Sequence, residues 1–143
     1  MTIAKVLLVD DERPFVETMM KRLNKREVEI MPAYNGQEAL EQLEKDNHIE
    51  VVILDIKMPV MDGMEALSRI KAKHPLVEVI MLTGHATVET GIEGMKMGAF
   101  DYLMKPCNTE ELVAKVQAAA ARKRQHEEKI MEARLKTITL RRP

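Results

Sequence analysis

The chain has 143 residues, 45% of them hydrophobic, which predicts a single domain with a core of ordinary size. Its formal net charge is -1, but acidic side chains are in excess over residues 1–121 and basic ones over residues 122–143, so no nucleic-acid-binding surface is expected on the main body. The only cysteine, Cys107, excludes an intramolecular disulfide, and the lack of a membrane-length apolar run or a signal-peptide pattern leads us to expect a cytoplasmic protein with no membrane partner.

Short apolar runs alternate along the chain with segments of helical spacing. The apolar runs are rich in Val, Ile and Leu and have the length of buried strands. They lie at residues 5–9, 28–33, 51–54, 78–82 and 99–104. Apolar residues at helical spacing fill the segments between them, and proline, glycine or an N-cap residue marks the ends of these segments. The expected helices lie at about residues 14–26, 37–46, 64–74 and 87–97, with the last one opening after Asn108.

Five strand–helix pairs with short connections imply right-handed crossovers and a parallel sheet with helices on both faces. The predicted fold class is therefore α/β, a three-layer α/β/α sandwich. No proline or glycine interrupts the last helix before Pro143, so we expect a domain at residues 1–121 followed by a basic helical extension or linker at residues 122–143. A coiled-coil linker could begin near residues 122–129, although a sustained a/d seam is absent.

Polar side chains stand at the ends of four of these five strands. They are Asp10 and Asp11, Asp55, Thr83 and Lys105. Parallel strands end at the same edge of the sheet, where open α/β sheets bind ligands, so these side chains are expected to meet there. Each alone has an ordinary structural explanation, as a helix N-terminal charge, a turn or a strand exit. Their joint placement favours a functional site.

Three carboxylates at one site repel one another unless a cation shares it. Mg²⁺ suits such a site, because it prefers a few carboxylates and several waters, often with a phosphate oxygen. Asp55 could be a passive ligand, or it could attack phosphorus and form an aspartyl phosphate. In the second case the metal, the Lys105 ammonium and the Thr83 hydroxyl could neutralise the phosphoryl oxygens.

The motifs at these strand ends form an ordered set. They are Val9-Asp10-Asp11-Glu12, Asp55-Ile56-Lys57-Met58-Pro59 with Asp62-Gly63, Thr83-Gly84, and Tyr102 three residues before Lys105-Pro106. Over about residues 3–121 this set resembles the receiver domain of two-component response regulators. The resemblance implies a flavodoxin-like five-stranded parallel sheet of order 2-1-3-4-5.

The resemblance also assigns roles at the site. Asp55 would accept a phosphoryl group from a sensor histidine kinase, a phosphotransfer protein or a small phosphodonor. Mg²⁺ would be held by Asp10, Asp11, Asp55 and the backbone carbonyl of Lys57. The phosphorylated form would be lost slowly by self-hydrolysis, and no turnover of an external substrate is expected.

Further residues are implied to act as the switch. Thr83 would move toward the phosphoryl group, Lys105 would pair with it and Tyr102 would rotate inward. This would remodel the face of the fourth helix, fifth strand and fifth helix for a downstream output protein or domain, or for a phosphorylation-dependent homodimer. The Lys105–Pro106 bond is expected to be cis.

Two positions are implied to tune dephosphorylation. Lys57 and His85, two residues past Asp55 and Thr83, would control the access of water to the phosphoryl group. For His85 the alternative is an exposed loop histidine. Cys107 stands where the family often has a bulky apolar residue, and we expect a buried, inert thiol there.

Other functions fit less well. A phosphatase of the haloacid dehalogenase type would need an acid two residues past the nucleophile, where this chain has Lys57. A flavin-binding protein would need a glycine- or hydroxyl-rich loop after the first strand. The chain could also be the receiver portion of a longer DNA-binding transcriptional regulator, although direct nucleic-acid binding by this chain is not expected.

Overall fold

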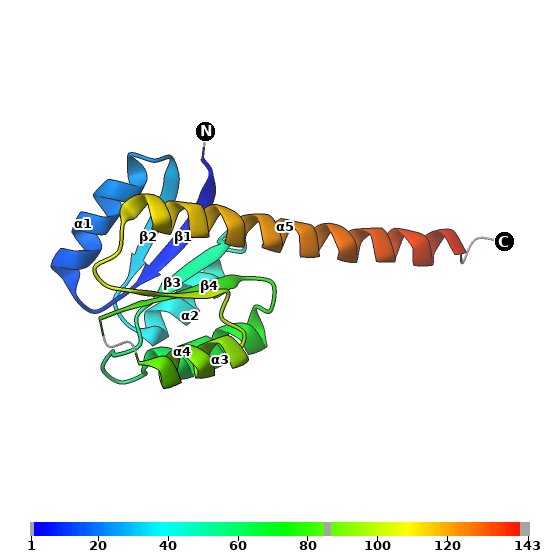
Figure 1. Cartoon of the computed structure of the whole chain (residues 1–143). Coiled ribbons are helices and arrows are strands. Elements are labelled where there is room, and N and C mark those ends of the chain that lie inside the picture. The colour runs from blue at the N-terminus through cyan, green and yellow to red at the C-terminus, as the bar shows by residue number, and fades with distance from the viewer. Residues whose placement is uncertain (1, 85–86, 141–143) are drawn as a thin grey trace.

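A parallel sheet of five strands forms the centre of the computed structural model, which describes residues 2–84 and 87–140. Strands and helices alternate along the chain (Figure 1). Their bounds are β1 Ala4–Val9, α1 Arg13–Asn24, β2 Val28–Ala33, α2 Gly36–Lys45, β3 Val51–Leu54, α3 Gly63–Lys73, β4 Glu78–Thr83, α4 Val88–Lys96, β5 Asp101–Met104 and α5 Thr109–Leu140. The strand order is β2-β1-β3-β4-β5 with every pair parallel, so the predicted fold class and order are confirmed.

Alternate residues of each central strand enter different cores, because successive side chains point to opposite faces of a sheet. On one face, Leu7 and Val9 of β1 join a cluster with the buried residues of α2 and α3. On the other face, Val6 and Leu8 join a cluster with α1 and α5. The central strands are thus buried on both sides, which explains their continuous apolar runs.

The fifth strand is shorter than predicted. The apolar run begins at Ala99, but its N–H bonds to the carbonyl of Gly94 at 3.0 Å and closes the end of α4. Phe100 makes the first bond to the neighbouring strand, donating to Val79 at 2.7 Å, and β5 begins at Asp101. An apolar residue here serves the helix end rather than the sheet.

Helix α5 packs on the sheet in its first part only. Its buried residues end at Lys123, and beyond that point it projects from the domain as one continuous helix (Figure 1). The predicted helical extension is therefore present through Leu140. Two arginines hold the helix at its exit: Arg122 Nε lies 2.8 Å from Glu78 Oε2, and Arg124 bonds both carboxylate oxygens of Glu50 at 2.7 Å. Across the described residues, no helix is long and apolar enough to cross a membrane.

Candidate functional site

Asp10 and Asp55 directly follow β1 and β3, two neighbouring strands. The backbone N–H of Asp10 donates to Ala33 and that of Asp55 donates to Val9, each at 3.0 Å. The hydrogen-bond ladder therefore continues one residue past each strand and fixes both aspartates at the same edge of the sheet. Both side chains are buried, whereas Asp11 is exposed.

Carboxylate oxygens of Asp10, Asp11 and Asp55 all lie within 4.8 Å of one another. Such a set of hard oxygen donors can hold a divalent cation, as the sequence predicted for these three residues. The electrostatics agree, since the pKa of Asp10 is raised, chiefly because burial disfavours its ionised form. Hydrogen bonds from Lys105 and from the N–H of Glu12 oppose that effect without cancelling it.

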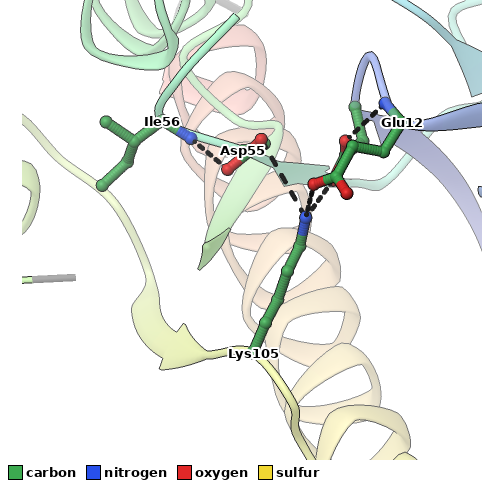
Figure 2. A network of polar contacts seen from close by, with 5 residues as sticks. Glu12, Asp55, Ile56 and Lys105 are labelled. Carbon is green, nitrogen blue, oxygen red and sulfur yellow. Dashed lines mark hydrogen bonds and ion pairs between the residues drawn. The ribbon is translucent and has the colours of Figure 1, made fainter. Parts of the chain in front are cut away.

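Lys105 extends from the end of β5 into this cluster (Figure 2). Its N–H donates to the carbonyl of Thr83 at 2.9 Å, which ties it to the end of β4. Its ammonium lies 2.6 Å from Asp10 Oδ2 and 4.0 Å from Asp55 Oδ2. Burial acts to lower the pKa of Lys105, but the hydrogen bond to Asp10 and the nearby carboxylate charges outweigh it, so the pKa is raised. The Lys105–Pro106 peptide bond is cis.

The loop after Asp55 closes tightly back on itself. The N–H of Ile56 donates to Asp55 Oδ1 at 2.8 Å (Figure 2), and the N–H of Gly63 donates to the carbonyl of Ile56 at 2.6 Å. Only glycine fits at position 63, because a Cβ there would lie 2.1 Å from the carbonyl oxygen of Asp55. Lys57 is exposed on this loop and, with Asp11, lines a hollow beside the carboxylates.

Thr83 ends β4, the strand beside β3, and Tyr102 lies on β5, one strand further from Asp55. Thr83 is fully buried at the end of β4. The Tyr102 side chain is partly buried, and its hydroxyl pairs with Thr90 Oγ1 of α4 at 2.9 Å, so it is tied to the helix. His85 lies outside the described residues. Cys107 is half-buried rather than buried, and burial raises the pKa of its thiol.

Sequence reasoning did not assign a role to Glu12 or Phe15, although both contact Lys105. Glu12 Oε1 lies 3.2 Å from the ammonium, and the centroid of the Phe15 ring lies 4.1 Å from it. Glu12 stands next to Asp10 and Asp11 in the first motif, and Phe15 follows one helical turn later. That spacing is a weak signal, because the chain separates both residues from Lys105 by some ninety positions.

Comparisons with known proteins agree with this geometry. The family model for the response regulator receiver domain matches residues 6–117. Regulatory protein AtoC of Escherichia coli (strain K12) is 39% identical over 117 residues, covering 82% of this chain and 25% of AtoC. The transcriptional regulatory protein YesN of Bacillus subtilis (strain 168) is 39% identical over 137 residues, which cover 92% of this chain and 37% of YesN. The chain therefore spans well under half the length of these two relatives.

Solved structures of receiver domains and of a longer regulator also resemble this chain. A receiver domain protein from Clostridium thermocellum has a TM-score of 0.81 and 37% identity, covering 85% of this chain and 98% of that one. NtrX from Brucella abortus, crystallised with ADP, has a TM-score of 0.82 and 28% identity, covering 90% of this chain and 29% of NtrX. With the carboxylates, lysine and threonine all at the strand ends, the chain belongs to the response regulator receiver domain family, whose members are signalling switches of two-component systems.

Proposed function

We propose that Asp55 is the phosphoacceptor of this switch. The observation that carries the proposal is the state of the two buried carboxylates. Both oxygens of Asp10 are engaged, Oδ1 by the N–H of Glu12 at 2.9 Å and Oδ2 by Lys105 at 2.6 Å. Asp55 Oδ1 is engaged by Ile56, but within the described residues no hydrogen bond reaches Oδ2. Asp55 Oδ2 is therefore the buried carboxylate oxygen best placed to attack.

The proposed reaction is the transfer of one phosphoryl group. Asp55 Oδ2 attacks phosphorus, and the bond from phosphorus to the leaving group breaks as the new P–O bond forms. The electron pair stays with the leaving group, which is the imidazole of a phosphohistidine in a sensor kinase or phosphotransfer protein, or acetate when acetyl phosphate is the donor. Asp10, Asp11, Asp55 and the carbonyl of Lys57 would hold Mg²⁺, which when bound neutralises negative charge on the carboxylates and the phosphoryl oxygens.

The remaining residues would convert the transfer into a change of shape. Lys105 would pair with the phosphoryl group, Thr83 would turn toward it, and Tyr102 would leave Thr90 and rotate inward. Helix α4 can follow such a movement, because Gly94 is its only buried residue in the part of the chain described here. Val88 and Ile92 of α4 are 79% and 52% exposed, so the face of α4, β5 and α5 offers apolar surface to a partner.

Mass spectrometry tests the central step directly. With Mg²⁺ and acetyl phosphate, the protein should gain the mass of one phosphoryl group, and Asp55→Asn should gain none. Asp46→Asn is the matched control, because Asp46 lies at the end of α2, away from the cluster, and forms an ion pair with Lys5. The Asp46→Asn protein should gain the same mass as the unaltered protein. A full gain in Asp55→Asn, or none in the unaltered protein, would refute the assignment.

We further propose that Lys57 and His85 tune the slow self-hydrolysis by controlling access of water to the phosphoryl group. Exposure of Lys57 beside the carboxylates supports its part in this. Lys57→Ala and His85→Ala should each change the half-life of the phosphorylated form severalfold, followed as loss of the added mass after the donor is removed. Unchanged half-lives would show that these positions do not shield the group.

The output is proposed from the relatives. AtoC is named a regulatory protein and YesN a transcriptional regulatory protein, and both are much longer than this chain. We propose that residues 1–121 form the receiver domain and that residues 122–143 link it to an output partner or DNA-binding domain. Phosphorylation-dependent homodimerisation through the face of α4, β5 and α5, extended by the projecting helix, is part of this proposal.

A further inference from the structure

Glu12 holds the Lys105 ammonium together with Asp10. Its Oε1 lies 3.2 Å from Nζ, against 2.6 Å for Asp10 and 4.0 Å for Asp55 (Figure 2). Glu12 is the N-cap residue of α1, yet its side chain makes no capping hydrogen bond, so the carboxylate is available for Lys105. Its N–H bonds to Asp10 Oδ1 at 2.9 Å, which fixes the backbone of Glu12 beside that aspartate.

Phe15 supports the ammonium from the same element. Its ring centroid lies 4.1 Å from Lys105 Nζ, within the range of a cation–π interaction. Glu12 is the N-cap residue, and Phe15 lies three positions later in the first turn of α1. The start of α1 therefore contacts the lysine through one charge and one ring, and the Glu12 carboxylate lies closer to the ammonium than the Asp55 carboxylate does.

We propose that Glu12 is a positioning residue that holds Lys105 on the α1 side before phosphorylation and competes for it afterwards. The inference rests on the proposed function of Asp55. A phosphoryl group on Asp55 gains Lys105 only if the ammonium gives up or shares its present partners. Asp10 is also a proposed metal ligand, so a bound cation would share its charge. Glu12 then remains the carboxylate that opposes the transfer of Lys105 to the phosphoryl group.

Removal of the Glu12 charge should therefore strengthen binding of a phosphoryl group at Asp55. Beryllofluoride, which stands in for that group, can be titrated into the protein at fixed Mg²⁺ and its bound form measured by ¹⁹F NMR. Glu12→Gln should lower the half-saturating concentration about two- to fivefold, the scale of a partly exposed ion pair. Glu17→Gln is the control, because it removes the same charge from an exposed position of α1, and it should leave the value unchanged.

A double-mutant cycle separates positioning from plain charge repulsion. If Glu12 acts through Lys105, Glu12→Gln should have no effect on beryllofluoride binding in a Lys105→Met background. An equal gain in both backgrounds would overturn the proposal, since removal of any nearby negative charge would then explain it. No gain in the presence of Lys105 would overturn it as well.

The same proteins distinguish this inference from the proposed function. If acetyl phosphate does not modify Asp55 in the unaltered protein, the proposed function fails and the inference fails with it. If Asp55 is modified but Glu12→Gln and Glu17→Gln bind beryllofluoride alike, only the inference fails. Melting temperatures of the variants within a few degrees of the unaltered protein confirm that each is folded.

Discussion

A buried carboxylate is costly unless its charge is matched, and Asp10 shows this at the scale of one residue. Its pKa is raised above the ordinary value of 3.8, chiefly by burial. A raised pKa means that the folded state prefers the protonated form, so this contribution to stability is lost as the pH rises from 3.8 through the folded value. Without a divalent cation, the cost of burying the Asp10 charge therefore opposes folding above this pH range.

Asp10→Asn should consequently raise the melting temperature in EDTA by a few degrees. Lys105 would keep Glu12 and Asp55 nearby, so the substitution does not leave its ammonium without a negative charge. At a Mg²⁺ concentration ten times its Kd, Mg²⁺ should raise the free energy of unfolding of the unaltered protein by about 1.4 kcal/mol. The same Mg²⁺ concentration should stabilise Asp10→Asn much less. Thermal melts in EDTA and in Mg²⁺ check both statements. A lower melting temperature for Asp10→Asn in EDTA would show that its ion pair with Lys105 outweighs burial.

At the scale of elements, α5 is fixed to the start of the strands, opposite the carboxylates. Arg124 bonds Glu50 just before β3 and donates to the carbonyl of Ile3 at 2.9 Å, while Arg122 meets the buried Glu78 that opens β4. These contacts bring the basic run of residues 122–124 to the domain. The basic run therefore serves the fold, in addition to its place in the proposed linker.

Arg124→Ala should lower the free energy of unfolding by about 1 kcal/mol, because the pair with Glu50 is bidentate but partly exposed. It should also speed hydrogen exchange of the backbone amides around residues 120–128. Urea denaturation and exchange mass spectrometry measure the two effects. Arg134→Ala is the control, from the exposed part of α5, and equal effects of both substitutions would show that the exit contacts do not anchor the helix.

The elements were largely predictable because local residue patterns determine them. The run from Val51 to Leu54 is buried on both faces, and such a run is recognisable without knowledge of its neighbours. The predicted start of the fifth strand at Ala99 was wrong, because the residue type does not reveal that the Ala99 N–H bonds to the end of α4. The contacts of Glu12 and Phe15 with Lys105 were not predictable, because they depend on how far the Lys105 side chain extends from the end of β5 toward the start of α1.

At the scale of the whole molecule, the projecting part of α5 leaves apolar side chains in solvent. These are Ile130, Met131, Leu135, Ile138 and Leu140, each at least 40% exposed. Most helical stability in proteins comes from packing of an apolar face, so burial of this surface against a second copy would stabilise the projecting helix. The exposed apolar residues of α4 lie in the same domain and could join such an interface.

Beryllofluoride with Mg²⁺ should therefore raise the solution mass toward that of a dimer, measured by sedimentation equilibrium. Leu135→Gln should weaken the dimer about tenfold, because it places a polar group in the buried surface. Lys136→Gln, the next residue along the helix, should have little effect. Identical monomer masses with and without beryllofluoride would exclude the homodimer.

The way α5 leaves the domain also has a mechanical consequence. Residues 122–140 reach about 28 Å at 1.5 Å per residue, so the exit contacts of Arg122 and Arg124 act as a fulcrum and the helix as a lever arm. A tilt of about 5° at the fulcrum moves the tip by about 2.4 Å on this length. A small change of angle at the exit contacts would thus be amplified at the far end of the helix, at Leu140.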